Sequence, residues 1–224
     1  MLLFILFTEH IFSRSIFQLD EKTFQQSVIK GDKTVPWFIM FGSENCPACI
    51  QAAPEFEQAS ERTRGYVRFG YADTKYTPNI ATQLKIWSIP AFFLFTNNNT
   101  EIFTGQRTST GFLSFISDTL GDGLEEADES WVDQTDNRVI LFTKRFKAPV
   151  FFSAVHYAFR NKGITFGMTR DSETIELFEN PPIPSIWFLK NGEKTHYKDK
   201  LDYFSIIEAI SKHFGIEFDD GLDL

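Results

Sequence analysis

Cysteine is scarce in this chain: only two of its 224 residues are cysteines, Cys46 and Cys49. A secreted fold held together by disulfides would need more of them, spread more widely along the sequence. A bridge between residues three positions apart closes a very short loop, so it would restrict the unfolded chain little. We therefore predict that these two cysteines serve chemistry rather than stability.

Histidine is also sparse, and the four histidines are scattered along the chain. Because no second cysteine pair exists, a structural zinc site lacks ligands. We expect neither a bound metal nor a cofactor.

Positive charge is under-represented, with 22 Lys and Arg against 30 Asp and Glu and a net charge of −8. Nucleic-acid binding needs a positive surface, so we expect no nucleic-acid partner. The acid is concentrated from Asp118 to Asn137, where eight carboxylates occur without a Lys or Arg. We expect a solvated linker over residues 122–137; weak calcium binding is the alternative, although no EF-hand spacing is present.

Apolar runs long enough to cross a bilayer are missing as well, and we expect no membrane span. The N-terminal run MLLFILF is far too short, but it resembles the core of a signal peptide. Ser13-Arg14-Ser15 then provides a small-x-small cleavage site. We expect residues 1–15 to be a signal peptide; the alternative, since no Lys or Arg precedes the run, is a buried first strand of a cytosolic protein.

Phenylalanine, in contrast, is abundant, with 26 residues. Most of this material is expected in packed cores. The alternative is that some of it lines an exposed peptide-binding face.

Hydrophobic periodicity and turn signals predict two similar successions of strands and helices. The first half should hold strands at 16–19, 35–41, 67–72, 91–95 and 102–103 and helices at 21–30, 46–62, 78–85 and 110–120. The second should hold strands at 139–142, 164–168 and 184–189 and helices at 149–161 and 202–214. In both halves an Ile-Pro pair, Ile89-Pro90 and Ile183-Pro184, comes just before an apolar strand. The repetition indicates one architecture used twice.

Cys46-Pro47-Ala48-Cys49 follows an apolar strand, Pro54 lies further along the same helix, and Ile89-Pro90 precedes a later strand. This combination resembles the thioredoxin superfamily, and within it the protein disulfide isomerases. The resemblance implies an α/β protein with two tandem thioredoxin-like folds, each a central mixed sheet flanked by helices. It covers residues 16–121 well and 138–215 more loosely, which leaves an acidic tail at 216–224.

The position of the two cysteines at a helix start assigns them different roles. Unsatisfied backbone N–H groups and the helix dipole favour a thiolate at Cys46, which makes it the nucleophile. Cys49 lies one turn on and can attack the mixed disulfide to release the product. Pro47 suits the first helical position, where no N–H is needed.

The resemblance adds residues around the dithiol. It implies a cis proline at Pro90, lying against the cysteines, where it and Ile89 expose backbone to a peptide substrate and keep metals away. Asn45 and Pro47 flank Cys46 and are expected to contact substrate. Arg107 matches a loop arginine that lowers the pKa of the second cysteine; the alternative is an ordinary surface charge.

The sequence also departs from the isomerase pattern. Asn45 stands where Trp is usual, Pro47-Ala48 replaces Gly-His, and Met40 stands where a buried acid accepts the proton of the second cysteine. The second half has Lys147-Ala148-Pro149-Val150 where a dithiol would lie. It should therefore be redox-inactive and serve as a substrate-binding or spacer module.

These features favour a thiol–disulfide oxidoreductase or isomerase acting on unfolded or disulfide-bonded proteins of the secretory pathway. One alternative is a chaperone-like protein with a slow or vestigial dithiol, and another is a cytosolic thioredoxin-like reductase. Asn98-Asn99-Thr100 is a glycosylation sequon, with Asn98 as the acceptor. The endoplasmic reticulum lumen is the expected compartment, although the C-terminal Asp-Gly-Leu-Asp-Leu is no KDEL-type signal and leaves secretion open.

Overall fold

The computed structural model describes residues 15–97, 99–178 and 181–217. All of the predicted signal peptide except Ser15, the Asn98 acceptor and nearly all of the acidic tail lie outside these ranges. The chain divides into two compact units, residues 1–113 and 114–224. Each unit is described by itself.

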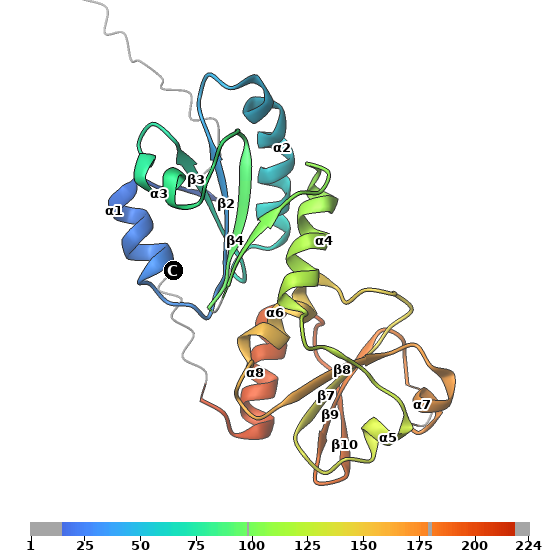
Figure 1. Cartoon of the computed structure of the whole chain (residues 1–224). Coiled ribbons are helices and arrows are strands. Elements are labelled where there is room, and N and C mark those ends of the chain that lie inside the picture. Colours follow the sequence, from blue (N-terminus) through green and yellow to red (C-terminus); the bar gives the residue numbers. More distant parts are fainter. Residues whose placement is uncertain (1–14, 98, 179–180, 218–224) are drawn as a thin grey trace, which may run out of the picture. The chain divides into compact units, whose positions relative to one another are not determined.

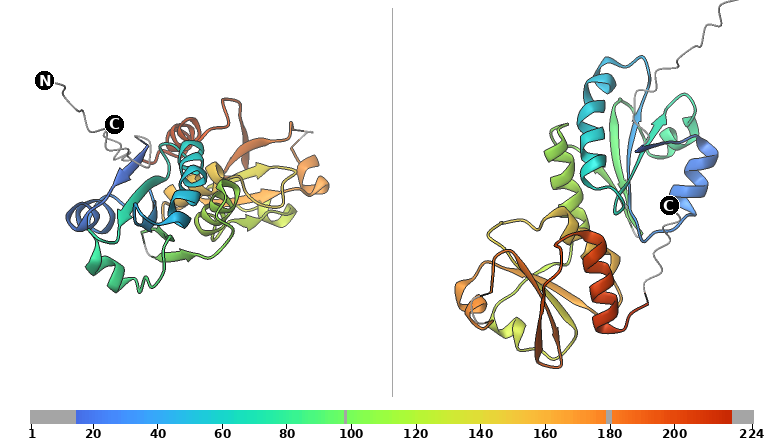
Figure 2. Two further views of the ribbon diagram at one scale, coloured as in Figure 1. Left: turned by 90° about the horizontal axis from the view of Figure 1, so that it is seen from above. Right: turned by 180° about the vertical axis from the view of Figure 1, so that it is seen from behind.

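The first unit is a five-stranded mixed sheet with helices on both faces (Figures 1 and 2). The strand order is β1-β3-β2-β4-β5; β1, β3 and β2 run parallel, and β4 and β5 are antiparallel to their neighbours. Its elements are β1 (Ile16–Gln18), α1 (Glu21–Thr23) with the π-helix η1 (Phe24–Ile29), β2 (Trp37–Gly42), α2 (Pro47–Arg62), β3 (Arg68–Asp73), α3 (Pro78–Gln83), β4 (Ala91–Phe95), β5 (Thr100–Phe103) and α4 (Ser109–Leu120). The boundary between the units falls inside α4.

Strand β2 lies at the centre of this sheet, and all six of its residues are buried. Successive side chains point to opposite faces of the sheet. Phe38 therefore joins rings from α2 and β4, including Phe56 and Phe92, while Phe41 packs against Phe24 on the other face. A strand covered on both faces explains the unbroken apolar run. Phenylalanine forms much of the core, because many of the fully buried side chains are phenylalanines.

The second unit repeats the same topology. Its strand order, β6-β8-β7-β9-β10, matches β1-β3-β2-β4-β5, with three parallel strands followed by two antiparallel ones. Its elements are β6 (Glu125–Glu126), α5 (Glu129–Val132), β7 (Arg138–Phe142), α6 (Val150–Ala158), β8 (Thr165–Thr169), α7 (Ser172–Glu176), β9 (Ser185–Lys190), β10 (Glu193–Tyr197) and α8 (Tyr203–Phe214). The predicted fold class, two tandem thioredoxin-like α/β folds, is confirmed.

The acidic stretch 122–137 is not a linker, which corrects the sequence prediction. It contains β6, which pairs in parallel with β8, and α5, which Asp128 caps through the backbone N–H of Trp131. The carboxylates project outward while Trp131 and Val132 are buried in the core of the second unit. The many acidic residues led to the linker prediction, because only a few apolar residues attach this segment to the sheet.

In the described residues, no helix combines the length and the apolar character that crossing a membrane would require.

Candidate active site

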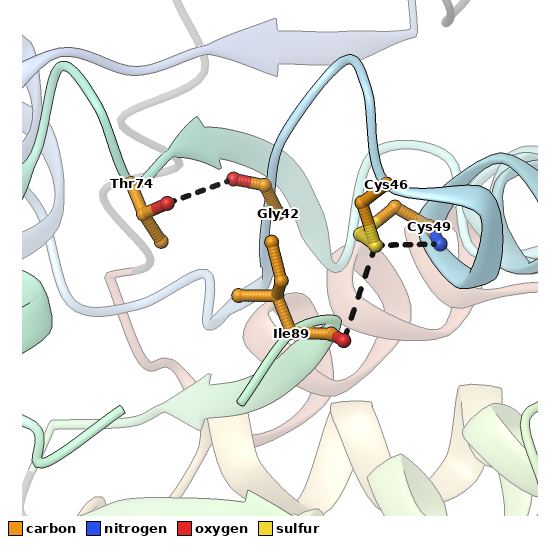
Figure 3. The surroundings of a disulfide bond; sticks show 5 residues. All are labelled: Gly42, Cys46, Cys49, Thr74 and Ile89. Carbon is orange, nitrogen blue, oxygen red and sulfur yellow. Dashed lines mark hydrogen bonds between the residues drawn. A yellow bond between two sulfur atoms is a disulfide. The ribbon is translucent and has the colours of Figure 1, made fainter. Parts of the chain in front are cut away.

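Cys46 and Cys49 lie where the central strand β2 gives way to helix α2, and they form a disulfide with their Cα atoms 5.1 Å apart (Figure 3). Cys46 is the N-cap residue of α2 and has extended backbone angles, and Pro47 begins the helix. The Sγ atom of Cys46 accepts a hydrogen bond from the backbone N–H of Cys49, at 3.2 Å. The same N–H also donates to the Cys46 carbonyl oxygen, at 3.0 Å, so the first turn of the helix directs a shared backbone donor at this sulfur.

The two sulfurs lie in different environments. Cys46 is half-buried, whereas Cys49 is only 2% exposed. After reduction, charge on Cys46 gains from the N-terminus of α2, while charge on Cys49 loses hydration. The arrangement suits an outer sulfur that meets a partner and an inner one that reacts only with the outer.

The Ile89-Pro90 segment lies beside the dithiol, at the same end of the sheet. Strand β4 runs antiparallel to β2 and pairs Ala91 with Phe41, so the residues just before β4 lie beside the loop that carries Cys46. The Ile89-Pro90 peptide bond is cis. The carbonyl oxygen of Ile89 lies 3.9 Å from Cys46 Sγ, within hydrogen-bonding reach of a thiol there (Figure 3). Pro90 itself is buried.

A pair of hydrogen bonds fixes the end of β2. The backbone N–H of Thr74, just after β3, donates to the carbonyl oxygen of Gly42 at 3.0 Å. The Thr74 hydroxyl donates to the same oxygen at 3.3 Å (Figure 3). Because the loop to Cys46 starts here, this tie holds the active-site loop on the rigid centre of the sheet.

The remaining predicted residues lie at the surface. Asn45 and Pro47 are exposed on either side of Cys46. Arg107 is exposed in the loop between β5 and α4. Among the described residues, no hydrogen bond or ion pair joins it to either cysteine, so the structure does not bring Arg107 into the site.

Tyr71 also lies near the dithiol, and the sequence did not predict this placement. The parallel pairing of β2 with β3 places it beside Met40, on the same face of the sheet, and both side chains are buried. A Cβ added to Gly42 would lie 3.2 Å from Cys49 Sγ and 3.5 Å from the Tyr71 hydroxyl oxygen. Burial raises the pKa of Tyr71, and the carboxylates of Asp73 and Glu44 raise it further. The sequence shows a tyrosine in a predicted strand, but it does not show the register that places this tyrosine near Cys49.

Large apolar side chains next to Cys49 and near Ile89 in sequence are exposed to solvent. Ile50, directly after Cys49, is 52% exposed, and Trp87, two residues before Ile89, is 88% exposed. Side chains of this kind can contact apolar segments of a polypeptide.

The second unit keeps this architecture without the chemistry. Pro149 is the N-cap of α6, where Cys46 caps α2, and the Ile183-Pro184 bond is again cis. No cysteine occurs in this half of the sequence. Phe146, in the loop before α6, is 84% exposed, and the guanidinium of Arg170 lies 4.4 Å from the centre of its ring.

Comparison with known sequences supports the thioredoxin-like fold. The thioredoxin family model matches residues 15–118. A Dictyostelium discoideum protein, whose name assigns it provisionally to the protein disulfide-isomerases, is 24% identical over 219 residues, covering 88% of this chain and 53% of that protein. The chain thus spans about half the length of this relative. Thioredoxin 1 of Nostoc sp. is 30% identical over 78 residues, covering 35% of this chain and 71% of that protein.

Among solved structures, full-length ERdj5 superposes with a TM-score of 0.57 and 15% identity, covering 90% of this chain and 33% of that one. The structure of ERdj5 form I gives a TM-score of 0.58 with 15% identity, covering 90% of this chain and 30% of that one. At this level of identity the likeness concerns the fold, and it extends over both units.

Proposed function

This chain belongs to the thioredoxin superfamily, and from this premise we propose that it exchanges disulfides with other proteins through Cys46 and Cys49. One observation carries the proposal. A half-buried cysteine caps an exposed helix N-terminus, and its buried partner lies one turn further on. Only the outer sulfur can meet a client, and only the inner one is placed to displace that client.

In the reducing direction, the Cys46 thiolate attacks a client disulfide, forms a mixed disulfide and releases one client thiolate. Cys49, as thiolate, then attacks Cys46 Sγ, which restores the internal disulfide and releases the second client thiolate. The dithiol loses two electrons and the client gains them. Oxidation of a client dithiol follows the same steps in reverse.

Protein clients, rather than small disulfides alone, are the substrates we propose. The backbone of Ile89 lies beside Cys46 Sγ, with Asn45 and Pro47 exposed next to it. An extended client segment would meet the Ile89-Pro90 backbone as its disulfide reaches Cys46. Exposed Trp87 and Ile50 would contact its apolar side chains.

Trapping of the mixed disulfide tests this function. The full-length Cys49→Ser protein, mixed with an oxidised unfolded client, should accumulate a covalent complex that a reductant dissolves on a gel. Cys46→Ser should form none, since Cys49 is buried. The proposal fails if neither variant traps a client and the wild-type protein reduces none.

A second candidate is a client-binding protein whose dithiol is slow or vestigial. Met40 in place of a buried acid, and exposed Phe146 in a unit without cysteines, favour it. Suppression of client aggregation by the Cys46→Ser/Cys49→Ser double variant separates the two. Full suppression together with negligible exchange by the wild type would favour the binding protein.

For the compartment, we propose the secretory pathway, on the strength of the apolar N-terminal run and the sequon at Asn98. Expression of the full chain in eukaryotic cells tests this. Glycosidase treatment should increase gel mobility, and Asn98→Gln should abolish that shift.

A further inference from the structure

We propose that the hydroxyl group of Tyr71 stabilises the thiolate of Cys49 by donating a hydrogen bond to it when the Cys46–Cys49 disulfide opens. This inference rests on the proposed function, because it concerns the inner sulfur of the same dithiol. It assigns Tyr71 as a positioning and charge-stabilising residue.

The absence of a side chain at Gly42 brings the two groups together. A Cβ at this position would lie 3.0 Å from the Tyr71 ring, 3.5 Å from its hydroxyl oxygen and 3.2 Å from Cys49 Sγ. The phenol and the inner sulfur therefore face one small space above the end of β2. A side chain at position 42 would crowd both groups.

The residue paired with Tyr71 on the neighbouring strand cannot donate this hydrogen bond. Met40 is paired with Tyr71 across β2 and β3 and is completely buried. Its thioether carries no hydrogen that could be donated to a thiolate. A thiolate at Cys49, 2% exposed, needs a donor because water reaches it poorly.

The environment of Tyr71 makes it a donor rather than a base. Burial and the carboxylates of Asp73 and Glu44 raise its pKa, so the phenol keeps its proton over the physiological range.

The chemical step balances without any proton leaving Tyr71. An incoming thiolate attacks Cys46 Sγ, a new disulfide forms there, and the Cys46–Cys49 bond breaks. The electron pair of that bond goes to Cys49 Sγ, which accepts the Tyr71 O–H. In resolution the same hydrogen bond raises the fraction of Cys49 present as the attacking thiolate.

The first experiment measures the pKa of Cys49. In the Cys46→Ser protein, Cys49 is the single cysteine, and the ¹³Cβ shift of labelled cysteine follows its ionisation. Adding Tyr71→Phe should raise this pKa by about one unit, as expected for loss of a hydrogen bond to a charged group. Tyr66→Phe is the matched control, because its hydroxyl donates to the Arg62 carbonyl at the far end of α2.

The second experiment separates the two chemical steps by stopped flow. Tyr71→Phe should slow opening of the Cys46–Cys49 disulfide by glutathione about tenfold, while attack of reduced Cys46 on a model disulfide stays within about twofold. An unchanged Cys49 pKa, or an equal loss in both steps, would overturn the inference. Inactive wild-type protein would instead overturn the proposed function, and the pKa measurement would still be readable.

Discussion

At the scale of single residues, the end of strand β2 shows how an expected acid has been replaced. Met40 is buried and carries no titratable group, and Tyr71 stands next to it on the adjacent strand. The polar atom near Cys49 thus comes from β3 rather than from β2. The sequence shows that the acid is missing at position 40, but it does not show that Tyr71 lies beside this position.

Replacement of Met40 by Glu tests whether an acid at this position still helps. We expect Met40→Glu to speed release of the mixed disulfide, because a carboxylate beside the inner cysteine can take its proton. Burying the carboxyl group should cost about 2 kcal/mol of stability. Stopped-flow kinetics and urea unfolding measure the two effects.

Met40→Gln serves as the control, since glutamine has the shape of glutamate but accepts protons much more weakly than a carboxylate. Burial raises the pKa of the introduced Glu above its unfolded value, so the variant should lose stability as the pH rises through and above about 4.3. If Met40→Glu alters only the attack step, or neither step, an acid at this position does not serve Cys49.

At the scale of elements, the acidic stretch shows how few apolar residues are needed to attach a segment to a sheet. Trp131 of α5 is 7% exposed; its Nε1 donates to Glu125 at 2.5 Å, and the Arg138 guanidinium lies 4.6 Å from its ring centre. A Cβ at Gly167 of β8 would lie 2.7 Å from the Trp131 ring, so strand and indole touch closely. This segment is part of the second core.

Trp131→Ala should therefore destabilise the second unit by about 3–5 kcal/mol, as for other buried aromatic residues. Chemical denaturation followed by circular dichroism measures the loss. Trp87→Ala is the matched control and should change stability little, because Trp87 is 88% exposed. Equal effects of the two substitutions would mean that residues 122–137 contribute nothing to the fold.

Helix α6 carries a pH-sensitive contact. His156 is buried, and its Nε2–H donates to the carbonyl oxygen of Asp122 at 3.0 Å. Burial lowers its pKa below the usual 6.5. The unfolded chain therefore binds the proton more readily, so stability is present above about pH 6.5 and is lost as the pH falls towards the folded pKa.

We expect urea unfolding of the second unit to shift to lower urea between pH 7 and pH 5. His156→Gln should reduce that shift. It should not abolish it, because burial also lowers the pKa of His213 in α8. A shift of the same size in the variant would show that His156 does not titrate on unfolding.

The sequence predicted elements whose signals are local. The apolar run of β2 and the helix that begins after Cys46 both depend on neighbouring residues, and both are present. The placements that were missed depend on distant partners. β6 forms only because β8 lies beside it, and Tyr71 comes near Cys49 only through the register of β3 with β2. Arg107 was assigned by resemblance, and the structure leaves it at the surface.

At the scale of the whole molecule, one topology occurs twice, with cysteines in one copy. A unit with the same strand order but no dithiol can add a surface without adding a second reaction. We therefore expect the two units to divide the work between exchange and client binding.

A chain ending at Gly121 tests this division, because it keeps all of α4, whose Phe112 lies in the first aromatic core. It should reduce a small disulfide at the rate of the full chain and be several-fold slower on an unfolded protein. Rates measured on both substrates decide the matter. Undiminished activity on the unfolded protein would leave the second unit without this role.

The unequal burial of the two sulfurs also bears on oxidative damage. Peroxide would meet Cys46, the half-buried sulfur, and convert its thiolate to a sulfenic acid. Cys49 lies within bonding distance, as the disulfide shows, and would condense with that sulfenic acid and release water. The product is the ordinary oxidised form, which a thiol can reduce again. The inner cysteine would thus protect the outer one from irreversible conversion to sulfinic acid.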